Sequence, residues 1–215
     1  MKERPILFSA PMVRALLDGS KTQTRRVCKV QPTRERHFTG DGMAIVKKNC
    51  ATSIYSPLVQ LLCPYGQPGD RLWVRESYRL RRESLNGAPM DSVAPSMFCD
   101  STRHFEADGN APSWAGKLRP SIHMPRWASR ILLEVVSVRV ERLQDISEED
   151  AKAEGIEPHE VRQFAIFGLS KAERAAVYRD AAVGPYQGLW EQINGAGSWD
   201  ANPWVWVVEF KRVKP

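Results

Sequence analysis

Short runs of apolar residues, bounded by proline, glycine and polar clusters, are the main pattern along the chain. Four of them have the length and the β-branched and aromatic content of strands: 6–9, 71–75, 131–140 and 204–210. The run at 71–75 roughly alternates polar with apolar side chains, as a strand with one buried face does. A fifth strand is expected to begin at Thr22, so the pattern predicts about five strands.

Helical spacing is confined to shorter segments. Pro11 is placed to begin a helix, apolar residues follow it at spacings of three and four, and Gly19 suits the left-handed position after the last turn. The run Ser-Glu-Glu-Asp at 147–150 has the form of a capping box, which predicts that a second helix begins there. Two further helices are expected at 171–182 and 185–194.

The rest of the chain shows no sustained period. Residues 31–68 mix proline and glycine with short apolar groups, and residues from about 80 to 125 are rich in Ser, Pro, Asn, Asp and Arg. The second stretch is therefore predicted to be a long loop or an insertion. Neither an internal repeat nor the regular strand–helix–strand spacing of a doubly wound sheet is present. The pattern favours an α+β protein built on a small mixed β-barrel with flanking helices.

Composition and charge narrow the classes of partner. The 215 residues include 31 Lys and Arg against 25 Asp and Glu, a formal net charge of +6 that suits a polyanionic partner. No apolar stretch approaches the roughly 18 residues of a membrane helix, and the N-terminus does not read as a secretory signal. We therefore expect a cytoplasmic protein with no membrane partner, and no obligate protein partner is inferred. The scattered cysteines and histidines lack zinc-site spacing, so no metal is predicted.

One segment gathers polar chemistry at the junction between the first helix and the expected second strand. It reads Gly19-Ser20-Lys21-Thr22-Gln23-Thr24-Arg25-Arg26. If the strand begins at Thr22, side-chain alternation puts Thr22, Thr24 and Arg26 on one face. A lysine, a hydroxyl group and a guanidinium group are then expected to converge on one small site.

This segment resembles the G-x-K-x-x-(E/T)-x-R signature of ASCH domains, which belong to the PUA-like superfamily. With threonine at position 24, where many of these domains carry glutamate, it is most similar to the bacterial N4-acetylcytidine amidohydrolases. Later segments resemble that family in the same order: Gly69-Asp70 before a strand, 130–156 as a long strand and an acidic helix, and 206–210 as the closing strand. About half of the chain is covered. As a whole it also resembles the long ASCH proteins of phage and prophage genomes.

The resemblance implies a domain organisation and a catalytic set. It predicts a single PUA-like ASCH domain over 1–215, with insertions at about 31–66, 80–127 and 158–203. The implied catalytic residues are Lys21, Thr24 and, as the best match on the acidic helix, Glu154; Gly19, Thr22 and Arg26 are expected to bind the substrate. The implied reaction is hydrolysis of an amide C–N bond without metal or organic cofactor. It removes an acyl group from a modified pyrimidine nucleoside such as N4-acetylcytidine.

The residue types leave the identity of the general base open. The ordinary pKa of lysine is near 10.4, so Lys21 accepts a proton at neutral pH only if burial or its arginine neighbours lower that pKa by about three units. A nearby Glu154 has the opposite effect, because a negative charge keeps lysine protonated. In the second assignment a charged Lys21 therefore polarises the substrate carbonyl, and Glu154 takes the proton.

A second function is open as well, because the basic chain is also rich in tryptophan. Aromatic side chains beside Lys and Arg form stacking surfaces for single-stranded nucleic acid. Such a group lies in the stretch least typical of a core: Trp114, Lys117, Arg119, Arg126 and Trp127. The alternative to the enzyme is an RNA-binding module, with or without ribonuclease activity, encoded by a phage or prophage. Trp73 and Trp206 fall within predicted strands and are assigned to the core.

Overall fold

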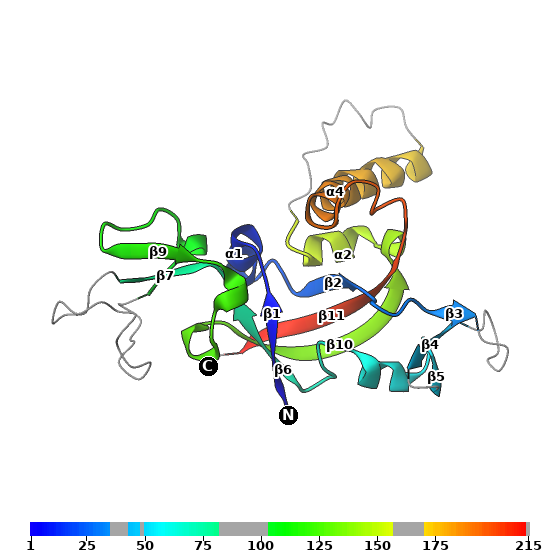
Figure 1. Ribbon diagram of the computed structural model, residues 1–215. Coiled ribbons are helices and arrows are strands. Elements are labelled where there is room, and N and C mark those ends of the chain that lie inside the picture. Colours follow the sequence, from blue (N-terminus) through cyan, green and yellow to red (C-terminus); the bar gives the residue numbers. More distant parts are fainter. Residues whose placement is uncertain (35–42, 48–49, 82–102, 157–169, 214–215) are drawn as a thin grey trace. The chain divides into compact units, whose positions relative to one another are not determined.

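The structure, a computed structural model, describes residues 1–34, 43–47, 50–81, 103–156 and 170–213 (Figure 1). The chain divides into two compact units, which we describe separately. Unit 1 contains 1–19, 69–134 and 211–215, and unit 2 contains 20–68 and 135–210. The prediction of a single ASCH domain with three insertions stays a prediction.

In its described residues, unit 1 consists of short strands, short 3-10 turns and the α-helix α1. Its elements are β1 (Glu3–Leu7), α1 (Ala10–Asp18), β6 (Arg71–Arg75), β7 (Tyr78–Arg81), β8 (Arg103–Phe105), β9 (Ala115–Arg119), the 3-10 turns η5 (Glu106–Asp108), η6 (Ser121–His123) and η7 (Arg126–Ala128), the start of β10 (Leu132–Arg142) and the end of β11 (Trp204–Val213). Strand β1 pairs with β6 in parallel, and β10 pairs with β6 antiparallel, which gives the order β1-β6-β10. Leu72, Val74 and Leu133 of these strands are fully buried.

Helix α1 forms as its sequence signals predict. Pro11 lies in its first turn, where no intrahelical partner for its nitrogen is needed. Gly19 follows its last residue with φ of 88°. That left-handed conformation is one that glycine adopts without steric cost, so the helix ends where the sequence predicts.

A second sheet in unit 1 corrects the prediction for the stretch from 80 to 125. Its described part is not one long loop, because it contributes to a three-stranded sheet of order β8-β7-β9. Tyr78, Leu80 and Phe105 point to one face of this sheet and pack on Met124 and Ala128. These strands are only three to five residues long and carry Arg next to their apolar residues. The polar composition of the stretch therefore suggested a loop, although apolar and polar side chains alternate in β7.

The described part of unit 2 contains the remaining described strands and the helices α2 and α4. Its elements are β2 (Gln23–Val27), β3 (Thr33–Arg34), β4 (Met43–Lys47), β5 (Cys50–Ser53), the 3-10 helix η1 (Pro57–Leu62), the 3-10 turn η8 (Leu143–Asp145), α2 (Glu148–Ala153), α4 (Lys171–Asn194) and most of β10 and β11. Strands β10, β11 and β2 are neighbours in that order within the five-stranded sheet β1-β6-β10-β11-β2, and β11 runs antiparallel to β2 with Val205 opposite Val27 and Glu209 opposite Gln23. Strands β3, β4 and β5 form a small antiparallel sheet in a stretch where no period was detected.

The two helices of unit 2 cover one face of β11. Helix α2 begins with the predicted capping box: Ser147 accepts a hydrogen bond from the backbone of Asp150, and the Asp150 side chain accepts one from the backbone of Ser147. Helix α4 lies beside α2 (Figure 1). The core between them and β11 consists of Leu143, Ile146, Ala151, Tyr186, Trp190, Trp199, Val205 and Val207.

The prediction of two helices at 171–182 and 185–194 is wrong, because α4 is one helix with Pro185 inside it. Proline removes one backbone hydrogen bond and usually ends or kinks a helix. Here Tyr186, the next residue, and Trp190, one turn further on, are buried in the core cluster. Tertiary packing therefore outweighs the local signal.

The α+β class is confirmed. Within the ranges that the structure describes, the strands form three sheets and none of these closes into a barrel. In the same residues, no helix combines the length and the apolar character needed to cross a membrane.

The capping box makes a testable contribution to stability. Replacing Ser147 by alanine removes the hydrogen bond that its side chain accepts at the start of α2, and should lower the free energy of unfolding by about 1 kcal/mol. Ser147→Thr is the matched control, because threonine keeps an oxygen that can cap the helix. Urea unfolding followed by circular dichroism measures both. Equal stability of Ser147→Ala and the wild type would show that this cap does not stabilise the helix.

Candidate active site

Lys21 and Glu154, 133 residues apart in the chain, meet inside unit 2. The Lys21 ammonium group lies 2.7 Å from Oε2 of Glu154 and donates a second hydrogen bond of 2.8 Å to the backbone carbonyl of Glu154. Their side chains are 0% and 3% exposed. A fully buried ion pair is uncommon, because both groups must leave water. The structure thus brings together two of the three residues of the expected catalytic set.

The backbone around the pair explains why these side chains meet. Lys21 and Glu154 form an isolated antiparallel bridge, and the Thr22 amide donates to the Ala153 carbonyl at 2.8 Å. Glu154 caps the C-terminal end of α2, where the helix dipole disfavours a negative charge. A carboxylate at this position needs a cation nearby, and Lys21 supplies it.

A second buried cation, Arg25, joins the pair. Its side chain is 0% exposed, and its Nη1 lies 3.7 Å from Oε1 of Glu154. Its Nη2 lies 2.9 Å from Asp150 and 3.3 Å from Glu141. One carboxylate thus has two cations beside it, and one of those cations is shared with two further carboxylates.

The network continues toward the surface through Arg139. This residue of β10 lies 3.1 Å from Asp150 and also pairs with Glu141 and Glu209. Sequence reasoning did not find Arg139, Glu141, Asp150 or Glu209 as site residues. A signal was present, because Arg139 and Glu141 alternate with valines in the most apolar run of the chain.

The two faces of β2 have different surroundings. Lys21, Gln23 and Arg25 all contact α2 or its end: the Gln23 side chain donates to the Asp150 carbonyl at 3.1 Å. Arg25 lies opposite Val207, which belongs to the core under the helices. Alternation therefore directs Thr24, which lies opposite Val208, to the other face.

The other residues expected at the site are distributed as follows. Strand β2 begins at Gln23 rather than Thr22, and Thr22 is exposed. Arg26 is half-buried and shares its face of β2 with Thr24, as alternation predicts. Thr24 itself is buried, with 2% of its surface exposed. Gly19 belongs to unit 1, where it ends α1.

Burial has the largest effect on the protonation of Lys21. Removal from water lowers the pKa of its amine below the ordinary value; Glu154 opposes this shift, and Arg26 and Arg25 add to it. Asp150 shows the opposite balance: burial raises its pKa, but the charges and hydrogen bonds of Arg25, Gln23 and Arg139 outweigh burial and leave the pKa lowered. The Lys21 amine therefore loses its proton more easily than an ordinary lysine does, although its contact with Glu154 opposes this shift.

The site keeps unused hydrogen-bonding capacity. Oε1 of Glu154 accepts no hydrogen bond from any described residue, and Nε and Nη1 of Arg25 donate none. Both residues are 4% exposed. An acceptor and two donors thus lie together beside a lysine with a lowered pKa. Nη1 of Arg25 and Oε1 of Glu154 form an ion pair at 3.7 Å, a distance too long for a hydrogen bond.

The residues expected to bind nucleic acid all lie in unit 1, in different settings. Lys117 is exposed on β9, and Arg119 lies at the end of that strand, opposite Tyr78. Trp114 forms an edge-to-face contact with His104. Arg126 is ion-paired with Glu3 at 2.8 Å, and the half-buried Trp127 packs on the core cluster of this unit. Of the aromatic pair, Trp114 is thus the one outside that cluster.

Among the described residues, no group of three or more His, Cys, Asp and Glu side chains could hold a metal ion. Cys28 and Cys63 are buried thiols outside any disulfide in these ranges, and burial raises the pKa of the Cys28 thiol to about 12. Such a thiol is protonated at neutral pH and therefore a poor nucleophile.

The buried pair predicts a characteristic pattern of stability. Lys21→Met should lower the free energy of unfolding by about 3–5 kcal/mol, because it leaves a buried carboxylate without its closest cation. The double variant Lys21→Met/Glu154→Leu should recover most of this loss. Lys152→Met is the control, since Lys152 pairs with Glu148 at the surface and contributes less than about 0.5 kcal/mol. Urea unfolding measures all four proteins, and a double variant no more stable than Lys21→Met would contradict the paired-charge explanation.

The lowered pKa of Lys21 also predicts the sign of a pH effect. Between its lowered pKa in the folded state and the ordinary value of 10.5, the unfolded chain binds more protons than the folded one. The free energy of unfolding of the wild type should therefore rise with pH across this window, relative to Lys21→Met/Glu154→Leu. Unfolding curves recorded from neutral pH to pH near 10.5 test this difference. Parallel pH profiles for the two proteins would show that the pKa of Lys21 is not lowered.

The resemblance to ASCH domains is carried by the residues of this chain alone. Comparisons with protein-family models, with curated proteins and with solved structures give no match. Membership of that family therefore stays a prediction, and the function has to be argued from the site.

Proposed function

We propose that the chain is an amidohydrolase of the ASCH type, which removes an acyl group from the exocyclic amine of a modified pyrimidine nucleoside such as N4-acetylcytidine. The observation that carries the proposal is the buried Lys21–Glu154 pair. These are the two positions that the resemblance assigns to a lysine and a glutamate of a catalytic set. A PUA-like barrel fold is part of the same proposal. The α+β class of the structure is compatible with that fold.

The protonation of Lys21 favours this residue as the general base. A base must be partly deprotonated at the working pH, and burial lowers the pKa of this amine in that direction. Glu154 then keeps the amine in place through Oε2, 2.7 Å from Nζ. The lowered pKa thus supports Lys21, rather than Glu154, as the general base.

The unused hydrogen-bonding groups match an amide. An amide presents a carbonyl oxygen that accepts and an N–H that donates. Nε and Nη1 of Arg25 are donors for the first, and Oε1 of Glu154 is an acceptor for the second. Arg25 thus takes the position of an oxyanion stabiliser, since negative charge develops on the carbonyl oxygen during attack.

Water is the nucleophile in the proposed reaction. Its oxygen bonds to the acyl carbon while Lys21 takes its proton, the C–N bond breaks, and the proton passes to the departing amine nitrogen. The products are a carboxylic acid and the free 4-amino pyrimidine nucleoside, so atoms and charge balance. Thr24 is given no covalent role, because alternation directs it away from the face that contacts α2.

Conversion of N4-acetylcytidine to cytidine, followed by absorbance, tests the proposal. Lys21→Met/Glu154→Leu should lose at least about 100-fold in kcat while keeping its fold, because general acid–base catalysis contributes at least that factor. Thr24→Val should retain activity, and Lys152→Met is the surface control. Turnover should barely respond to salt, because the substrate is neutral.

The pH profile separates the two candidate bases. With Lys21 as the base, kcat/KM of the wild type should rise with pH until the amine is deprotonated. The amidohydrolase proposal would be overturned if the wild-type protein hydrolysed neither N4-acetylcytidine nor cytidines that carry longer N4-acyl groups. Loss of activity in Thr24→Val, with Lys21 and Glu154 intact, would instead restore a covalent role for the threonine.

A further inference from the structure

The positive charge of the protein belongs to one of its two units. Over their full sequence ranges, unit 1 has 16 Lys and Arg against 10 Asp and Glu, whereas unit 2 has 15 of each. The whole net charge of +6 therefore comes from unit 1. A polyanionic partner is attracted to this unit, independently of the Lys21–Glu154 site in unit 2.

Acidic side chains of unit 1 are engaged by basic residues outside its three-stranded sheet. Glu3 pairs with Arg126 at 2.8 Å, and Glu134 pairs with Lys211 at 2.9 Å. Glu76 and Asp108 both pair with Arg130. Among the described residues, no carboxylate pairs with Arg79 or Arg81 of β7. Arg79 and Arg81 of β7 therefore contribute positive charge that no carboxylate of the described residues offsets through an ion pair.

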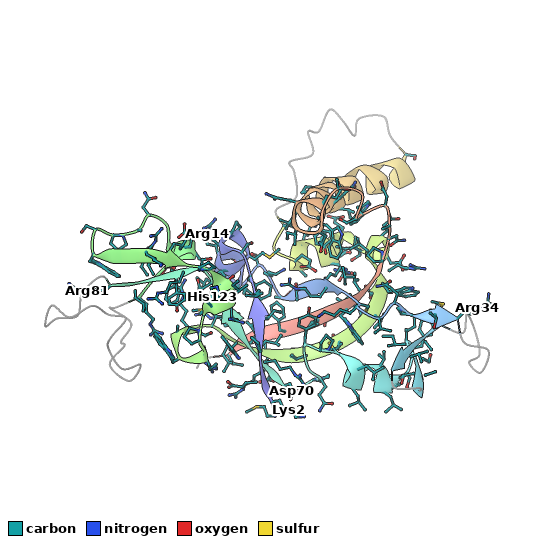
Figure 2. All side chains as sticks on the ribbon, in the orientation of Figure 1. Lys2, Arg14, Arg34, Asp70, Arg81 and His123 are labelled. Atoms are coloured by element: carbon teal, nitrogen blue, oxygen red, sulfur yellow. The ribbon has the colours of Figure 1, made fainter. Side chains whose placement is uncertain are left out.

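The two arginines project from the outer face of the sheet β8-β7-β9, which we define by Arg79, Arg81, His104, Trp114 and Leu118. Tyr78 and Leu80 point to the buried face, and Arg79 and Arg81 flank Leu80, so both arginines are turned away from that face. The pairing with β9 is interrupted by a register shift between them, and Arg81 lies opposite Ala115. Arg79 lies opposite both His104 of β8 and Leu118 of β9. Figure 2 labels Arg81 at the end of β7.

Aromatic and apolar groups lie beside these cations. Trp114 contacts the ring of His104 edge to face, with ring centroids 6.4 Å apart and an interplanar angle of 87°. Leu118 is 40% exposed on the same face. The Arg79 guanidinium donates to the Gly116 carbonyl at 3.0 Å, which holds the cation against β9. The outer face thus combines fixed positive charge with aromatic surface.

We propose that this outer face binds single-stranded nucleic acid. Arg79 and Arg81 contact phosphates, and the aromatic groups of Trp114 and His104 stack on unpaired bases. Stacking requires bases that are not already stacked in a duplex, and the face is a flat sheet rather than a helix that could enter a groove. The chemistry therefore selects a single strand.

The structure changes the set of residues assigned to nucleic acid. Trp114 is retained, and Arg79, Arg81 and His104 are added. Arg126 is already ion-paired with Glu3 and Trp127 packs on the core cluster, so neither belongs to the outer face. Arg119 lies opposite Tyr78 rather than opposite Arg79.

Fluorescence anisotropy with the full chain tests the proposal. The probes are a labelled oligouridine, an oligothymidine of the same length and a duplex, each titrated over a range of salt concentrations. Each phosphate contact on a single strand contributes about 0.7 to the slope of log K against log salt. Arg79→Ala/Arg81→Ala should therefore reduce that slope by about 1.4 and weaken binding roughly 20-fold at about 0.1 M salt.

Two further variants make the test specific to the face. Lys211→Ala/Arg212→Ala removes the same charge from unit 1 at β11 and should weaken binding much less. Trp114→Leu should weaken binding about tenfold with the salt slope unchanged, because stacking releases no counterions. Lys21→Met/Glu154→Leu should bind as the wild type does, so failure of this proposal is distinguishable from failure of the enzyme.

Three results would overturn the assignment. One is the absence of salt-dependent binding in the wild type. Another is an equal loss of affinity in Arg79→Ala/Arg81→Ala and in Lys211→Ala/Arg212→Ala, which would indicate attraction to overall charge alone. The third is tighter binding of the duplex than of either single strand. Comparison of oligouridine with oligothymidine then shows whether the face prefers the RNA or the DNA probe, and tight binding of either supports the proposal.

Discussion

The structure of unit 2 depends on one constraint: the charges of Lys21, Glu154 and Arg25 are buried and must therefore stay paired. An isolated buried charge costs several kcal/mol, so β2 and the end of α2 are stable together only while the lysine and the carboxylate remain in contact. The backbone reinforces this through the bridge between Lys21 and Glu154 and the hydrogen bond from Thr22 to Ala153. The capping box at Ser147 fixes where α2 begins, and so where its last carboxylate lies.

A purely structural pair would be expected to satisfy its own hydrogen bonds. Here the pairing is incomplete among the described residues, because Oε1 of Glu154 and two nitrogens of Arg25 have no hydrogen-bond partner. Unsatisfied buried polar groups cost free energy and call for a specific explanation. The proposed substrate amide would supply both kinds of partner. In the structure itself, Nη1 of Arg25 and Oε1 of Glu154 are an ion pair at 3.7 Å, which is longer than a hydrogen bond.

Local signals in the sequence predicted local structure, and long-range contacts decided the rest. The first helix could be predicted because Pro11 and Gly19 mark its ends, and the capping box at 147–150 because its hydrogen bonds are local. The meeting of Lys21 with Glu154 could not be derived from spacing, and it was expected only through the ASCH resemblance. The Arg25 and Arg139 network was missed because its members lie on three strands and a helix. Packing of Tyr186 and Trp190 likewise kept α4 continuous through a proline that predicted a break.

The distribution of charge relates the two proposals physically. A neutral nucleoside gains little from long-range attraction, so its site can lie in a unit with no net charge and rely on buried, short-range contacts. A nucleic-acid strand is attracted over the Debye length and held by many exposed contacts, which suits the basic unit with its open sheet face.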